Sequence, residues 1–170
     1  MAEPFQPRKL LETLVRHDVD FVLIGGMAGT ARGSAYVTLD LDIAYERSNA
    51  NLERLADALR ALGATLRGAP PDVPFLLDAQ TLANGANFTF DTRFGSLDIL
   101  SDPSGAPPYE TLRDGAGDPL DVEDARIRVA SLDHLIAMKE AAGRPKDLVM
   151  ASEYRVISDE LRRPRDDGVG

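Results

Sequence analysis

Two aspartates spaced two residues apart, Asp40 and Asp42, are the side chains of this sequence best suited to chemistry. They alternate with Leu41 and Ile43, and on a strand this alternation places both carboxylates on one face and both aliphatic side chains on the other. Two like charges on one face are unfavourable unless a cation lies between them. Carboxylate oxygens are hard ligands that suit magnesium or manganese, so the spacing predicts a divalent metal site.

A pair of glycines precedes the two acids and indicates a phosphate site. Gly25 and Gly26 follow the apolar run 21–24, which is typical of a buried strand. We expect a short helix over 27–32 whose amino end faces bound phosphates. A tight turn that needs positive φ would also explain the glycines, and the downstream acids favour the phosphate site. Ser34 is a further candidate to hydrogen-bond a phosphate.

The pair Gly25-Gly26, thirteen intervening residues, and Asp40-Leu41-Asp42 resemble the signature of the DNA polymerase β-like nucleotidyltransferases. The resemblance is to the small prokaryotic members, including the abortive-infection toxin type, and covers most of residues 10–155. It implies a nucleotidyltransferase fold of the α/β (α+β) class, with a mixed β-sheet flanked by helices and a C-terminal helix pair. It also implies transfer of a nucleoside monophosphate from a nucleoside triphosphate such as ATP to an acceptor hydroxyl, with release of pyrophosphate.

The resemblance also assigns a third carboxylate, which arrives in this family on a strand beside the Asp-x-Asp. Asp98 matches it, because residues 97–100 again place an acid among aliphatic residues. Asp91 and Asp102 lie at predicted strand ends and are typical of turns. In the implied mechanism Asp40 and Asp42 bridge two divalent ions, Mg²⁺ or Mn²⁺, and Asp98 holds one of them and helps to deprotonate the acceptor.

A basic helix pair completes the resemblance. A helix over 131–142 is followed by a second one over 145–161, with Gly143 ending the first. In the small nucleotidyltransferases, a lysine on the first helix and a basic residue near the start of the second face the triphosphate. The matching residues are Lys139 and Arg144, with Lys146 as a further candidate and Asp147 as the acid that orients a basic partner. A solvated helix-turn-helix with ordinary surface charges is the alternative.

The other elements serve to position these residues. Helices are predicted over 7–19 and 48–62, a short strand over 64–66, a hairpin over 87–91 and 94–100, and a strand over 126–129. The segment 101–124 is expected to be a loop with one helical turn. We expect one nucleotidyltransferase domain over 1–165, with its core over 7–130, its helix pair over 131–162 and a flexible tail over 163–170.

Composition narrows the class of protein. The chain has 170 residues, of which 44% are hydrophobic and 28% charged, as is usual for globular proteins, and it has no cysteine for disulfides or thiolate metal sites. Residues 1–4 lack the features of a signal peptide and no apolar run has membrane-spanning length, so we expect a cytoplasmic protein. The net charge of −9 argues against general binding of nucleic acid.

Several functions remain open at this stage. A catalytically inactive nucleotide-binding or regulatory module and a metal-dependent phosphohydrolase are the alternatives to a transferase. The acceptor can be an RNA end, a protein hydroxyl or a small hydroxylated compound such as an aminoglycoside. An RNA end is slightly favoured by one group of basic residues: Arg144, Lys146, Arg155, Arg162 and Arg163. The resemblance further implies a toxin-like role for some relatives, with a possible partner antitoxin.

Overall fold

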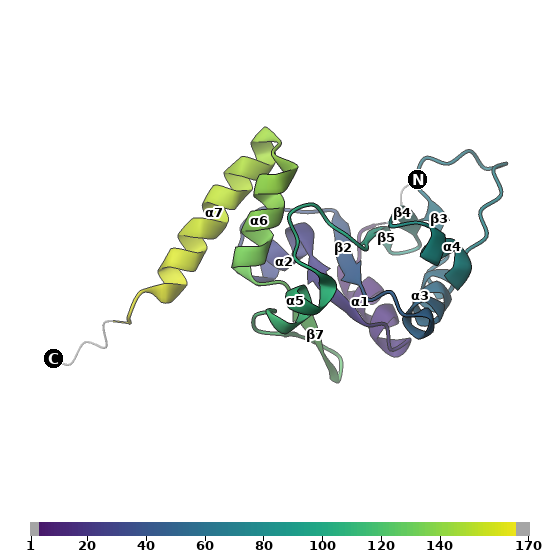
Figure 1. Ribbon diagram of the computed structural model, residues 1–170, viewed down its shortest axis with the longest axis horizontal. Helices are drawn as coiled ribbons and strands as arrows, with labels where there is room; N and C mark the ends of the chain where they lie inside the picture. Colours follow the sequence, from purple (N-terminus) through teal and green to yellow (C-terminus); the bar gives the residue numbers. More distant parts are fainter. Residues whose placement is uncertain (1–3, 166–170) are drawn as a thin grey trace.

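The fold is built around a seven-stranded mixed sheet with the strand order β3-β4-β5-β2-β1-β7-β6 (Figure 1). The computed structural model describes residues 4–165. The strands are β1 (Phe21–Ile24), β2 (Asp40–Tyr45), β3 (Thr65–Leu66), β4 (Asn87–Thr92), β5 (Gly95–Leu100), β6 (Leu120–Val122) and β7 (Ala125–Val129). Strand β2 is antiparallel to β1 and parallel to β5, and β4 and β5 form the predicted antiparallel hairpin.

The helices that flank the sheet are α1 (Pro7–Arg16), α2 (Gly25–Ala31), α3 (Asn49–Ala61), α4 (Ala79–Asn84), α5 (Tyr109–Asp114), α6 (Leu132–Ala142) and α7 (Pro145–Arg162). Figure 1 shows α6 and α7 side by side at one end of the molecule and α3 and α4 at the other. Ser48 and Ser131 cap α3 and α6 by accepting a hydrogen bond from the backbone N–H three residues later. Gly143 ends α6 with φ +69°.

Strand β2 lies at the centre of the sheet, between β5 and β1. Leu41 and Ile43 are fully buried, and they belong to one continuous core with the apolar residues of β1 and β5. By contrast, Leu39 is 68% exposed. It precedes the first residue of β2, so the sheet does not cover it.

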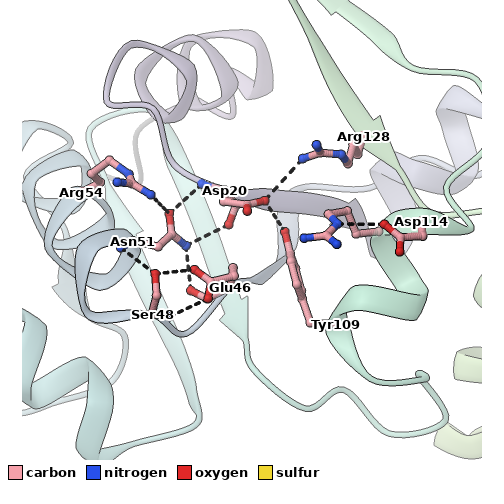
Figure 2. A network of polar contacts seen from close by, with 9 residues as sticks. Asp20, Glu46, Ser48, Asn51, Arg54, Tyr109, Asp114 and Arg128 are labelled. Carbon is pink, nitrogen blue, oxygen red and sulfur yellow. Dashed lines mark hydrogen bonds and ion pairs between the residues drawn. The ribbon is translucent and has the colours of Figure 1, made fainter.

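A polar network joins the ends of β1 and β2 to three other elements (Figure 2). Asn51 of α3 is fully buried and accepts a hydrogen bond from the Asp20 backbone N–H at 2.7 Å. Its amide donates to the backbone carbonyls of Asp20 at 3.0 Å and Glu46 at 2.7 Å. On the other side, the Asp20 carboxylate accepts a hydrogen bond from the Tyr109 hydroxyl at 2.7 Å and pairs with Arg128 at 3.4 Å. The chain entering β1 and the chain leaving β2 are therefore fixed to α3, α5 and β7.

Some element boundaries differ from the sequence prediction. Helix α2 begins at Gly25 rather than at residue 27, and α1 ends at Arg16. Helix α4, capped by Asp78, was not predicted because prolines dominate the segment before it. Strand β6 lies within the segment expected to be a loop. Residues 1–3, which enter the argument against a signal peptide, and 166–170, most of the predicted flexible tail, lie outside the described residues.

Among residues 4–165, none of the helices combines the length and the apolar character needed to cross a membrane.

Asn51 provides a test of this network. We expect Asn51→Leu to lower the free energy of unfolding by about 2–4 kcal/mol, because three partly buried backbone groups each lose a hydrogen bond to the Asn51 side chain. Urea denaturation measures the loss. Asn49→Leu is the matched control, since Asn49 is exposed and lies two residues earlier in the same helix; the stability of this variant should change by less than about 0.5 kcal/mol. Equal effects of the two substitutions would contradict a structural role for Asn51.

Candidate active site

Three aspartates lie on two adjacent strands in the middle of the sheet. Asp40 and Asp42 are on β2, and Asp98 is on the parallel neighbour β5, where it is directly opposite Asp42 in the strand register. Residues opposite one another in a sheet point to the same face. The structure therefore brings together the three acids proposed from the sequence, although more than fifty residues separate Asp42 from Asp98. Asp40 is exposed, and the other two are partly buried.

The pair Asp42 and Asp98 is electrostatically strained. Burial raises the pKa of Asp42 to about 7, and the negative charges of Asp98 and Asp40 contribute to the increase, while Lys139 opposes it. Burial also raises the pKa of Asp98, against the opposing charge of Arg67. At neutral pH a substantial fraction of Asp42 is thus protonated unless positive charge is added beside it.

Arg67 is a site residue that sequence reasoning missed. It follows the short strand β3, and its Nη2 lies 2.9 Å from Asp98 Oδ1. The same guanidinium donates from Nε to Asp91 Oδ1 at 3.2 Å and from Nη2 to the Phe90 carbonyl at 3.0 Å. Asp91, which the sequence indicated to be a turn residue, is instead the second carboxylate that holds Arg67 in place. Only the pairing of β3 with β4 brings Arg67 here, and no local pattern indicates that pairing.

The two glycines are required by their contacts with the segment that carries the acids. Gly25 has φ +67°, and a Cβ built on it would lie 2.0 Å from Asp42 Oδ2. A Cβ on Gly26 would lie 2.9 Å from the Cβ of Thr38. Any side chain at either position would push the start of α2 away from β2. The glycines therefore place the first backbone turn of α2 directly beside Asp42.

The structure does not bring Ser34 to this site. Its hydroxyl accepts a hydrogen bond from the Tyr36 backbone N–H at 3.2 Å, so it stabilises the turn after α2. Thr38, which we had not included, lies next to the glycines and donates to the Asp40 carbonyl at 3.3 Å. Its position immediately before the Asp-x-Asp strand was the signal that could have identified it.

The basic residues of the helix pair converge on Asp147. This carboxylate is only 2% exposed and lies 3.3 Å from Lys139 Nζ and 2.7 Å from Arg144 Nε. It also accepts a hydrogen bond from the Arg144 backbone N–H at 3.3 Å, which satisfies that group at the start of α7. The hydrogen bond from Arg144, followed by the interactions with Lys139, lowers the pKa of Asp147. Asp147 thus fixes two cations beside the acids while remaining ionised.

Two cavities open on either side of these residues. Cavity 1 has a volume of about 310 Å³ and lies between the β4–β5 hairpin and α6. Cavity 2 has a volume of about 660 Å³ and lies between the segment 36–39 and the start of α7. Both cavities are lined by the same five charged side chains: Asp42, Asp98, Lys139, Arg144 and Asp147. These residues form the boundary at which ligands of the two cavities would meet.

The donor chemistry of the acids fits a hard divalent cation, as the sequence predicted. Within residues 4–165, however, no three His, Asp or Glu side chains converge closely enough to form a complete metal site. Magnesium is commonly held by one or two carboxylates together with the phosphates of a substrate. Asp42 and Asp98, with Asp40 beside them, suit that kind of shared site better than a metal site formed by protein ligands alone.

No protein-family model and no curated protein sequence matches the chain. Several solved structures share its fold. The lincosamide antibiotic adenylyltransferase LnuA, solved with lincomycin bound, is 13% identical and has a TM-score of 0.59 over 91% of this chain and 99% of its own. The antibiotic-resistance factor ANT(2'')-Ia, in its solution structure, is 14% identical with a TM-score of 0.56, over 91% of this chain and 84% of its own.

A second structure of ANT(2'')-Ia, a crystal structure in complex with adenylyl-2''-tobramycin, is likewise similar. It is 14% identical, with a TM-score of 0.54 over 92% of this chain and 94% of its own. At such identities the likeness concerns the fold. The chain has the nucleotidyltransferase fold, and the fold class predicted from the sequence is confirmed: a mixed sheet flanked by helices.

The strain at Asp42 predicts how stability depends on pH. A carboxyl whose pKa is raised on folding stabilises the protein fully below the unfolded pKa of about 4, and this contribution is lost as the pH rises through about 7. Without divalent ions, Asp42→Asn should remove this loss. The variant should therefore be more stable than the wild type at pH 8, by roughly 2–4 kcal/mol.

Urea denaturation in EDTA between pH 4.5 and 8 measures the difference between the two curves. Asp159→Asn, on the exposed surface of α7, is the control, and its free energy of unfolding should change with pH in the same way as that of the wild type. If the free energies of unfolding of Asp42→Asn and the wild type differ by the same amount at every pH in this range, the pKa of Asp42 is not raised on folding.

Proposed function

We propose that this protein is a metal-dependent nucleotidyltransferase, which transfers a nucleoside monophosphate from a nucleoside triphosphate to the hydroxyl of an acceptor. The observation that carries the proposal is the register of Asp42 with Asp98, beside the Gly25-Gly26 turn and opposite Lys139. This arrangement offers carboxylates for cations, bare backbone for phosphates and fixed positive charge. The fold, shared with adenylyltransferases, supports the same reaction.

The reaction forms one bond and breaks another. The acceptor oxygen attacks the α-phosphorus, the bond from that phosphorus to the bridging oxygen breaks, and pyrophosphate leaves. Asp40, Asp42 and Asp98 would hold divalent cations, which when bound neutralise charge at the entering and leaving oxygens. Asp98 would accept the proton of the acceptor hydroxyl.

The remaining residues position the triphosphate. Lys139 and Arg144 would neutralise the leaving pyrophosphate, and the glycines would let the backbone approach the outer phosphates. Since Asp147 already fixes the two cations, little reorganisation would be needed at the moment of transfer.

From the distribution of charge we infer which cavity would take each of the two substrates. Cavity 2 adds the exposed Lys146 and Asp40 to the five shared charged side chains and is bordered by Gly26 and Thr38. A triphosphate fits this polar side, because positive charge and backbone amides both favour it. Cavity 1 is then the acceptor side, and Asp98 lies at the boundary between the two.

The structure does not support the slight preference for an RNA end. Two of the basic residues that favoured it are engaged by acids of α6: Arg155 by Glu140, and Arg162 by Asp133. A surface neutralised in this way attracts a polyanion only weakly. The contacts within residues 4–165 and the comparisons also give no support to a toxin role or an antitoxin partner, and we propose neither.

A small hydroxylated compound is the acceptor that the structure favours. Cavity 1 has the dimensions of a small-molecule pocket. Two of the proteins with this fold were solved with such compounds, lincomycin in LnuA and adenylyl-2''-tobramycin in ANT(2'')-Ia.

The transfer itself is tested with α-labelled nucleoside triphosphates, magnesium and separate pools of small hydroxylated compounds, total RNA and cell proteins. Label should move to a small compound, and Asp42→Asn should reduce the rate by at least about 100-fold because the carboxylate pair is lost. Asp159→Asn should keep the wild-type rate. Label on RNA or protein alone would contradict the small acceptor, and triphosphate binding without any transfer would indicate an inactive binding module.

Lys139 tests the orientation of the triphosphate. Lys139→Ala should weaken the binding of a nucleoside triphosphate by about tenfold or more, and that of the monophosphate much less, because the missing charge faces the outer phosphates. Isothermal titration with both ligands measures the two changes. Arg155→Ala, which removes a cation outside both cavities, is the control. Equal weakening for the two ligands would place Lys139 elsewhere in the site.

A further inference from the structure

The lining of cavity 1 consists of a charged part and an uncharged part. Its charged side chains are the five that it shares with cavity 2. Every other lining residue is uncharged, and most are apolar, among them Phe88, Leu100, Leu135 and Met138. The cavity is thus an apolar pocket that ends at the catalytic carboxylates.

From this lining we propose, building on the proposed function, that the acceptor is an uncharged amphiphilic compound rather than a polycation. Its apolar part would lie against Phe88, Leu100 and Met138, and its hydroxyl would reach Asp98 at the charged end. Burying apolar area in such a pocket contributes roughly 25 cal/mol per Å². Asn87, Thr89 and Ser104 would orient further hydroxyl or amide groups without requiring charge on the acceptor.

A polycation would find few partners in cavity 1. Asp147 is already bound by Lys139 and Arg144, and Asp98 is bound by Arg67. The third acid of the cavity, Asp42, would hold a divalent cation in the proposed function. Lys139 and Arg144 would repel an ammonium group at the end where the reacting hydroxyl must lie. The apolar wall would in addition leave any ammonium group placed against it without a hydrogen-bond acceptor, and a buried unpaired charge is costly.

The net charge of the chain does not reverse this preference. The charge of −9 is spread over the whole protein and attracts cations at long range. At physiological ionic strength such attraction is screened over about 8 Å. Contacts inside the cavity are screened far less, so the local balance of Lys139 and Arg144 against the acids decides which acceptor stays bound.

Hexyl β-D-glucopyranoside and 2-deoxystreptamine are suitable probes, because both carry ring hydroxyls and only the second is a dication. The glucoside should bind at least about tenfold more tightly than 2-deoxystreptamine in isothermal titration. A saturating non-hydrolysable triphosphate with magnesium should leave the glucoside affinity unchanged. Comparable or tighter binding of 2-deoxystreptamine, failure of the glucoside to bind, or competition between glucoside and triphosphate would each overturn the inference.

Substitutions in the cavity locate the binding. Met138→Asp should weaken glucoside binding by about tenfold or more because it places a carboxylate in the apolar wall, whereas Met138→Leu should keep it within about twofold. Ala142→Asp makes the same change at an exposed position at the end of α6, where folding is less affected, and should also weaken it. Val156→Asp, on the exposed face of α7, is the control. Equal affinities for all four variants would overturn the inference.

Label transfer separates this inference from the function on which it rests. If the glucoside binds as expected and no compound is labelled, the proposed transferase is wrong while the ligand class of cavity 1 is supported. If label moves to 2-deoxystreptamine in preference to the glucoside, the transferase stands and the inference is overturned.

Discussion

The repulsion between Asp42 and Asp98 is the constraint on which the rest of the site depends. Two carboxylates in register on neighbouring strands cannot both ionise in a partly buried position without nearby positive charge. The structure supplies part of that charge from outside the sheet, through Arg67 beside Asp98 and Lys139 opposite Asp42. These groups reduce the strain and do not abolish it, since the pKa of both acids remains raised. The site is therefore ready for an additional cation, and its affinity for one comes partly from relief of this repulsion.

Asp147 explains how the cations stay close to the acids without neutralising them completely. A lysine next to two carboxylates would otherwise fold onto them and block the position that a ligand needs. Because Asp147 holds Lys139 at 3.3 Å and Arg144 at 2.7 Å, their charge acts at a fixed distance from Asp42. A hydrogen bond from the Arg144 backbone N–H ties the same carboxylate to the start of α7, so the position of the cations is set by the helix pair. The hydrogen bonds between Asn51 and Asp20 fix β1 and β2 at the ends of these strands that lie away from the site. The repulsion between Asp42 and Asp98 therefore does not disturb the rest of the sheet.

The sequence predicted those parts of the site that follow from local periodicity. The alternation of Asp40, Leu41 and Asp42 defined the faces of β2, and serine caps and glycine ends located α3 and α6. Asp98 needed more than periodicity, because its partner strand is distant in the chain, and the family resemblance supplied that pairing. Arg67 and the acids that neutralise Arg155 and Arg162 were missed, since they depend on which elements pack together. Ser34 was assigned from its residue type, and the turn that it stabilises is formed only in the folded chain.

The two cavities show that local rather than overall charge decides what this acidic protein can bind. The excess of acids lies largely on the surface, where solvent and salt screen it. At the boundary of the cavities, by contrast, Lys139 and Arg144 stand against a carboxylate pair whose own burial opposes its full ionisation. An anionic phosphate on one side and a neutral hydroxyl on the other are compatible with that balance. Once Asp42 and Asp98 hold a divalent cation, as we propose, a second polyanion or a polycation would each meet like charge beside them.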